Sequence, residues 1–269
     1  MRSMESIRSL PFLQPGILPY HLLLFVRMTG LFLLSPIFGR SGVPARLKAG
    51  LAMAMAFLLS AVFPPPPGYA AGPIPAYALD AILELSVGLL MGYVTLVFFS
   101  TTQIAGHVID ISMGMGVGSI FDPNTRTMTP LSGALLNYAM LLYFFVNNGH
   151  IKLLTLLYAS LRAVPIGEVR LSGGLALMAV EQFTLAFGLA ASLMLPLVGA
   201  ALLTETAMGI LMRAVPQLNA YMVGIPMKVG IGLVLLYMMQ PLYGGFCDQV
   251  FTHLFSATEQ MILSVGGVG

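Results

Sequence analysis

Six long apolar segments follow one another along the chain, and short connectors rich in proline and glycine separate them. A helix needs about 20 apolar residues to cross a bilayer, and every segment but the second reaches that length. The pattern predicts an all-α integral membrane protein built of helices and helical hairpins. The segments lie at roughly residues 17–38, 49–63, 76–105, 131–160, 175–203 and 219–240. A turn is predicted inside the fourth of them, at Asn147-Asn148-Gly149-His150.

Several of these segments carry charge. A charge at the centre of a bilayer costs roughly 2.5–3.5 kcal/mol, yet Arg27 lies in the first segment and Lys228 in the last. A helix that begins near Ala76 would carry Asp80 and Glu84 in its first turns, where the helix dipole favours acids. Lysine and arginine also divide evenly between the two sides that six crossings would give, without the usual cytoplasmic excess. We therefore expect kinked helices that bury one another and neighbouring subunits.

The composition agrees with a membrane protein and excludes several kinds of site. Of the 269 residues, 58% are hydrophobic and 8% are charged, whereas soluble domains carry about 25% charged residues. The net charge of +2 is scattered along the chain, so we expect no nucleic-acid partner. Cys247 is the single cysteine, and the Cys and His residues lack the spacing of a metal site. We expect no metal and no cofactor.

The segment from Gln103 to Pro130 is rich in glycine and methionine. Glycine lowers helix stability by about 1 kcal/mol relative to alanine, so Gly114, Gly116 and Gly118 should end a helix or leave it pliable. Methionine is flexible and apolar, and it fills irregular gaps. The combination suits a deformable stopper that excludes water and ions but can be displaced. The alternative is helix packing through the GxxxG pattern of Gly114 and Gly118.

Other candidate chemistry is sparse. His107 and Asp110 are three residues apart and could meet on a helix face, either as a proton-relay pair or through a local hydrogen bond. The sequence has no Walker-type lysine motif and no dinucleotide-binding glycine motif after a strand. It also lacks a recognisable Ser/His/acid pattern. The sequence therefore predicts no active site, and we do not expect an enzyme.

The stretch from Ala201 to Leu233 combines charged side chains, polar side chains and two prolines between apolar segments. Proline removes a backbone donor and kinks or ends a helix. Broken backbone at membrane depth is tolerated against protein or along a polar passage. We therefore predict a bent helical hairpin in one of those settings. Its prolines are Pro216 and Pro226, and its polar residues are Glu205, Arg213, Gln217, Asn219 and Lys228.

This stretch resembles the signature of the FliR/SctT export-gate family of type III secretion systems. The signature runs from Arg213 through Pro216-Gln217-Leu218-Asn219 to Gly224-x-Pro226-x-Lys228. Further similarity extends through most of the chain, at Arg27-x-x-Gly30-Leu31, Gln103-x-Ala105-Gly106, Ile109-Asp110, Met113-Gly114, Asp122-Pro123, Asn148-Gly149-His150 and Gly232.

The resemblance implies a core subunit of the flagellar protein export gate, in the inner membrane at the flagellar basal body. Such a chain assembles with several copies of FliP and FliQ into a helical channel that passes unfolded rod, hook and filament subunits. FlhB, FlhA, proximal rod proteins and membrane lipid are the further partners implied. The implied fold is a single membrane domain, 1–269, with a FliP-like part at about 1–200 and a FliQ-like hairpin and tail at 201–269.

The resemblance also implies roles for particular residues. The glycine and methionine segment would plug the pore between passages. The hairpin would pack against FliP and FliQ, with its charges matched to polar groups of neighbouring chains. The implied plug residues are Met113, Gly114, Met115, Gly116, Val117, Gly118 and Phe121, and the implied interface residues are Glu205, Arg213, Gln217, Asn219 and Lys228.

Two other protein classes compete with the export gate. A small-solute secondary transporter also uses broken helices and buried charges, but it usually carries an inverted repeat, and none is visible in this sequence. An intramembrane enzyme would need clustered catalytic residues. The transporter is the closer alternative, because charges within apolar segments are what its substrate site requires.

Overall fold

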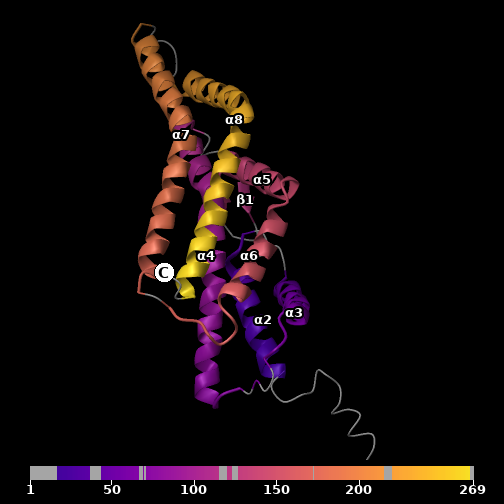
Figure 1. The fold of residues 1–269 in the computed structure, drawn as a ribbon. Helices are drawn as coiled ribbons and strands as arrows, with labels where there is room; N and C mark the ends of the chain where they lie inside the picture. Colours follow the sequence, from indigo (N-terminus) through magenta and orange to yellow (C-terminus); the bar gives the residue numbers. More distant parts are fainter. Residues whose placement is uncertain are drawn as a thin grey trace, which may run out of the picture. The chain divides into compact units, whose positions relative to one another are not determined.

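The computed structural model describes residues 17–36, 44–66, 69, 71–114, 120–122, 127–171, 173–214 and 220–266. Most of these residues are helical, so the predicted all-α class is confirmed (Figure 1). Strands β1 (Ile120–Asp122) and β2 (Thr127–Thr129) form a short antiparallel ribbon. The helices are α2 (Ile17–Leu34), α3 (Ala45–Val62), α4 (Ile74–Ser112), α5 (Leu131–Val146), α6 (Gly149–Ala163), α7 (Leu175–Ala214) and α8 (Ala220–Val265).

Each predicted apolar segment contains helix, but several ends differ. The second segment was expected to be short, yet α3 begins at Ala45 and so takes in Arg46 and Lys48. The fourth segment is two helices, α5 and α6, which meet at 68°. Their break is the predicted turn, where Asn148 adopts a left-handed φ of 55°. The pattern of apolar residues thus predicted where the helices lie. The positions of the helix ends depended on residues outside the apolar runs.

Length and composition allow several of the described helices to cross a membrane. Helices α2, α3, α4, α7 and α8, the last over residues Val223–Val265, are each long and apolar enough. The bent α5–α6 pair passes the same test only as one combined span. The described chain therefore offers five spans, or six with the bent pair, in agreement with the six predicted segments.

Proline does not break the last two helices. Pro226 was expected to break the predicted hairpin, but it lies inside α8, as Pro241 does, and α7 continues through Pro196. A proline costs a helix one backbone hydrogen bond, and the residues on either side keep theirs because an apolar environment offers their backbone no other partner. Pro216 lies outside the described residues.

The Cα packing divides the chain into two compact units, each made of segments distant in sequence. One unit holds residues 1–96, 151–180 and 255–269, and the other holds 97–150 and 181–254. The boundary predicted at about residue 200 falls within α7. That boundary rests on likeness to FliP and FliQ, which packing does not address, and it remains a prediction.

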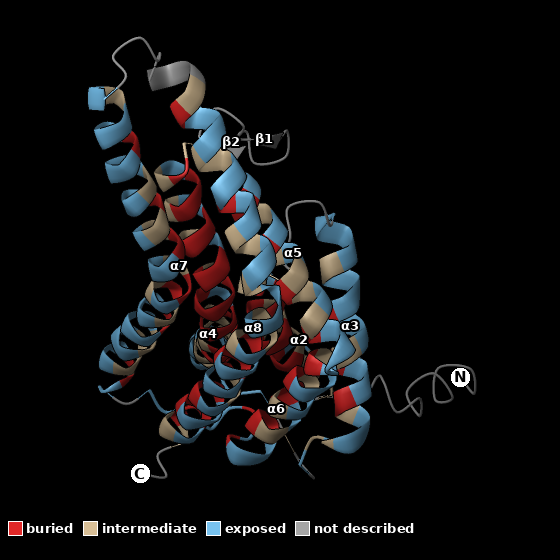
Figure 2. Ribbon diagram, turned by 90° about the horizontal axis from the view of Figure 1, so that it is seen from above, coloured by how far each residue is buried: buried red, intermediate tan, exposed pale blue. Residues whose placement is uncertain are grey.

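Each unit has its own apolar core. In the first unit, Leu24 and Met28 of α2 are buried, and α3 adds Ala52 and Ala56, which lie one turn apart on a single helix face. In the second unit, the rings of Phe99, Phe144 and Phe251 contact one another, with centroids 5.4–6.0 Å apart. Figure 2 shows the buried residues gathered on α2 and α4, whereas α3 and α7 are mostly exposed.

An ion pair lies in the core of the first unit. Arg27 of α2 and Glu84 of α4 are both fully buried, and Arg27 Nε donates to Glu84 Oε2 at 2.5 Å. Arg27 Nη1 also donates to the carbonyls of Ser160 and Val164, and Glu84 Oε1 accepts from the N–H of Gly167. The expectation that Glu84 lies in the first turns of a helix is wrong, because α4 begins at Ile74. Glu84 is instead held by the opposite charge and by a backbone donor.

Candidate functional site

Helix α4 extends further into the glycine-rich segment than predicted, because α5 packs closely against its end. A Cβ on Gly106 would lie 2.1 Å from Gly133 Cα, so the two backbones touch. Both carboxylate oxygens of Asp110 accept from Ser132 N at 3.2 Å. That N–H belongs to the first turn of α5, whose donors have no partner within their own helix. Asp110 therefore caps α5 from a neighbouring helix.

The structure does not form the proton-relay pair considered for His107. His107 is exposed, whereas Asp110 is buried. Among the described residues no hydrogen bond joins the two side chains, and the Asp110 carboxylate is directed to Ser132. The local hydrogen bond that was the alternative is also absent from this part of the chain. Asp110 has a structural role that i, i+3 spacing does not reveal.

The base of the predicted plug is the end of α4. The N–H of Met113 donates to Ile109 O at 2.9 Å, which completes the last helical turn. Gly114 then adopts a φ of 71°, the left-handed conformation in which helices commonly end on glycine. The prediction that a glycine ends the helix is confirmed at this residue. Since Gly114 is not helical, the GxxxG helix-packing alternative is wrong there.

The other predicted plug residues are described less fully. Met115, Gly116, Val117 and Gly118 lie outside the described residues. Phe121 lies in β1, where its backbone pairs with Met128, and its side chain is not among those described. The plug remains a prediction for these residues.

Met113 does not project away from the protein. Its side chain is 1% exposed and lies in the core of the second unit, with Ile109 and Leu197. It also fills the space beside Gly232 of α8, where a Cβ would lie 2.1 Å from Met113 Sδ. The first predicted plug residue is therefore anchored against α8.

The predicted hairpin charges meet each other. Lys228 Nζ of α8 donates to Glu205 Oε1 of α7 at 2.9 Å. The two helices lie close enough to pair these charges within the chain. Their expected role at an interface with neighbouring chains is not tested by this pair and remains a prediction. The side chains are 20% and 63% exposed, respectively, so the pair contributes no more than about 1 kcal/mol. Around it lies a pocket of about 380 Å³, lined also by Gly114, Met208 and Met212.

The remaining hairpin residues fall in two groups. Arg213 is exposed in the last turn of α7 and has no ion pair or hydrogen bond with any described residue. A cation there is favoured by the helix dipole alone, so its position is compatible with either a solvated end or a partner. Gln217 and Asn219 lie outside the described residues.

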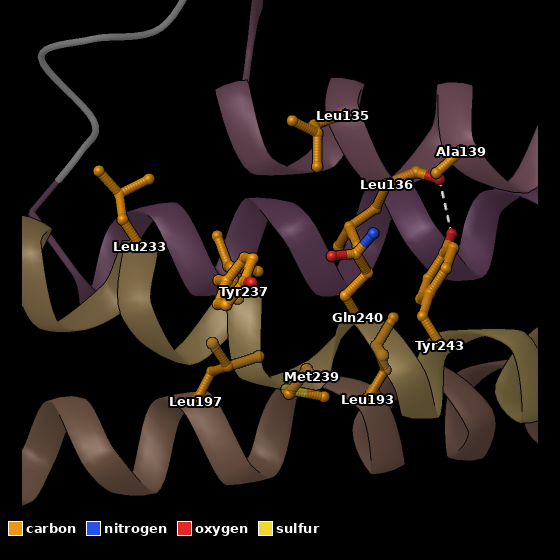
Figure 3. A pocket seen from close by; sticks show the side chains of 11 residues that line it. Leu135, Leu136, Ala139, Leu193, Leu197, Leu233, Tyr237, Met239, Gln240 and Tyr243 are labelled. Carbon is orange, nitrogen blue, oxygen red and sulfur yellow. Dashed lines mark hydrogen bonds between the residues drawn. The ribbon is translucent and has the colours of Figure 1, made fainter.

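A second hollow, which the sequence did not predict, lies among α5, α7 and α8 (Figure 3). It has a volume of about 360 Å³, and its lining is almost entirely apolar. Tyr243 borders it and donates its hydroxyl to Leu136 O at 2.6 Å. No sequence signal distinguishes its leucines from the many others in these helices. The other lining residues are Leu135, Ala139, Leu193, Leu197, Leu233, Leu236, Tyr237, Met239 and Gln240.

The chemistry available to these sites is limited. Within the described ranges no three His, Cys, Asp or Glu residues are grouped so that they could hold a metal ion. The candidate site consists of a glycine-terminated helix end, an ion-paired helical hairpin with a pocket around its ion pair, and an apolar hollow.

Comparison with known proteins identifies the family. The flagellar biosynthetic protein FliR of Escherichia coli (strain K12) is 28% identical over 241 residues, which cover 88% of this chain and 90% of the relative. FliR of Bacillus subtilis (strain 168) is 29% identical over 251 residues, covering 92% and 96%. The Yop proteins translocation protein T of Yersinia pestis is 28% identical over 182 residues, covering 67% and 66%.

The family match covers most of the chain. Residues 18–254 match the family described as "Bacterial export proteins, family 1". This range includes α4, α7, the part of α8 up to Leu254, and every predicted site residue. The chain therefore belongs to the bacterial export proteins of family 1.

Proposed function

We propose that this chain is a core subunit of a flagellar type III protein export gate in the bacterial inner membrane. The observation that carries the proposal is the family match over residues 18–254. The relatives' names, flagellar biosynthetic protein FliR and Yop proteins translocation protein T, both fit a type III export component. The flagellar relatives cover 88% and 92% of the chain and the Yersinia protein 67%, which favours the flagellum over the injectisome.

The gate is a hetero-oligomer in which this chain assembles with several copies of FliP and FliQ, and FlhB and FlhA associate with it. The exposed apolar helices support this assembly. In the most apolar stretch of α7 only 28% of residues are buried within the chain, and in that of α8 only 11%. Such surfaces need lipid or other subunits to cover them. Arg213 is exposed beside them and contacts a sister subunit, as do Gln217 and Asn219.

The plug comprises Met113–Gly118 and Phe121, and it seals the channel between passages. Support comes from the end of α4, where Gly114 stops the helix and a Cβ added to it would meet no atom within 4 Å. A glycine-rich segment resists displacement weakly, because glycine has little preference for any one backbone conformation. An unfolded subunit displaces the segment as it passes, and the seal forms again behind it. The chain acts as part of the conduit wall, and other components supply the energy.

Deleting Gly114–Gly118 tests the plug directly. With FliP and FliQ co-expressed, the variant should make the membrane leak small ions, because nothing then fills the channel at rest. The measurement is ion conductance or dye uptake, together with recovery of the complex to show that assembly persists. The same deletion expressed without FliP and FliQ is the control, since no channel should form. A variant that assembles with FliP and FliQ but does not leak ions would contradict the plug.

A further inference from the structure

We propose that Gly232 of α8 is a seat that fixes the base of the plug, and that Met113 is a stationary post rather than part of the displaceable stopper. The inference rests on the proposed plug and refines it. It separates the residues that must move during export from the residue that must stay in place.

The burial of Met113 supports its stationary role. The side chain is 1% exposed, and its N–H completes the final turn of α4. It shares a core with Leu136 of α5 and Leu197 of α7. Displacing it would expose apolar surface and open a cavity in a packed interior. A residue that every passing subunit pushed aside would not be expected in such a place.

The fit between Met113 and Gly232 makes the contact specific. A Cβ at residue 232 would lie 2.1 Å from Met113 Sδ, 2.9 Å from Cε and 3.0 Å from Cγ. The methionine therefore occupies the volume that any other residue at 232 would need. Gly230, two residues earlier in the same helix, would meet no atom within 4 Å if it carried a Cβ. The close approach is thus local to Met113, whose flexible side chain would have to move for any larger residue at position 232.

The position of the seat connects the plug to the hairpin. Gly232 lies four residues after Lys228, one helical turn away on the same side of α8. Lys228 is ion-paired with Glu205 of α7, and the pocket around that pair includes Gly114 among its lining residues. The left-handed Gly114 follows Met113 directly. The backbone is therefore fixed at residue 113, and the displaceable part begins at the next residue.

A disulfide between residues 113 and 232 distinguishes a post from a stopper. In the Met113→Cys, Gly232→Cys variant, the β-carbons should be within disulfide reach, about 3.5–4.5 Å, because Met113 Cγ is 3.0 Å from the position of Cβ at 232. In assembled gates, oxidation should form the bond and leave export of flagellar subunits unchanged. The two single-cysteine variants control for the oxidant and for Cys247. Failure of the bond to form, or loss of export on oxidation that reduction restores, would overturn the inference.

Matched glycine substitutions test the seat without a cross-link. Gly232→Ala should displace Met113 and raise the ion leak toward that of the Gly114–Gly118 deletion. Met113→Ala should do the same by removing the post. Gly230→Ala makes the same change in backbone freedom, but its methyl group would not contact Met113. This variant should not leak ions. Suppose that the deletion leaks ions while Gly232→Ala and Met113→Ala leak no more than Gly230→Ala. The proposed role of Gly232 is then wrong, and the proposed plug is still supported. If the deletion itself is tight, the proposed plug fails and the inference fails with it.

Discussion

At the scale of single residues, glycines determine where α4 contacts its neighbours. Gly106 allows backbone contact with Gly133 of α5, and Gly232 accommodates Met113. The two positions differ in what a methyl group would meet, because Gly106 faces backbone and Gly232 faces a flexible side chain. A substitution at 106 should therefore be resisted by the fold, whereas one at 232 should mainly relocate Met113.

We expect Gly106→Ala to destabilise the chain, because the added Cβ would lie 2.1 Å from Gly133 Cα and 2.3 Å from its N. Overpacking of this kind costs typically 1–3 kcal/mol, and a backbone can shift only by moving α5. Thermal unfolding of the purified gate complex measures the effect. Gly199→Ala in α7 is the control, since its Cβ would meet nothing within 4 Å. It should leave stability unchanged or raise it by up to about 1 kcal/mol. Equal stability of both variants would show that α4 and α5 are not in backbone contact.

At the scale of helices, the Arg27–Glu84 pair joins three parts of the first unit. Arg27 of α2 binds two carbonyls, Ser160 O of α6 and Val164 O just after it, and Glu84 of α4 binds the N–H of Gly167 in the following turn. The last carbonyls of a helix lack partners within it, so Arg27 caps α6 from outside. Arg27 Nη2 finds no partner among the described residues. The pair therefore stabilises the packing of α2, α4 and α6 at the cost of one unsatisfied donor.

Removing either charge alone should be costly. Breaking a buried pair leaves an uncompensated charge and typically costs 3–5 kcal/mol, so Arg27→Met and Glu84→Leu should each lower the unfolding temperature strongly. The double variant leaves no orphan charge and should cost clearly less than the sum of the two. It should still be less stable than the parent, because Val164 O and the N–H of Gly167 lose the hydrogen bonds that Arg27 and Glu84 give them. Unfolding of the purified complex measures all three variants. Additive losses would show that the two side chains do not interact.

At the scale of the whole molecule, α7 and α8 leave most of their apolar surface uncovered by the chain itself. Large side chains such as Leu203, Tyr237 and Leu242 are about 70% exposed or more, at 74%, 75% and 69%. Lipid or neighbouring subunits must cover this surface.

We expect Arg213→Ala to reduce co-purification of this chain with FliP and FliQ. Arg213 is exposed in the last turn of α7 and is unpaired among the described residues, so its guanidinium is available to a sister subunit. Arg162→Ala is a matched control, because Arg162 is likewise exposed in the last turn of its helix, α6. Both changes remove the same favourable interaction with a helix dipole. Equal recovery of FliP and FliQ with the two variants would leave Arg213 without an interface role.

Some features of this chain could be predicted because they depend on neighbouring residues. The apolar runs located the helices of the described residues, because a helix in a membrane must present apolar side chains over its whole length. The left-handed Gly114 follows the end of α4, and Asn147–Asn148 separates the two helices of the fourth segment, because local backbone preferences act within a few residues. The family signature around Arg213 likewise pointed to the export proteins that the comparison then identified.

Other features depended on which residues distant segments bring together. Arg27 and Glu84 were each noticed as charges in apolar helices, but their pairing needed the register of α2 against α4. The same holds for Glu205 with Lys228, for Asp110 at the start of α5 and for Met113 against Gly232. By itself the sequence determined the helices and the family, because apolar runs and a short residue signature are enough to identify them. Only the tertiary structure decided the pairings. The rotation and offset of one packed helix relative to another cannot be predicted from the sequence of either helix alone.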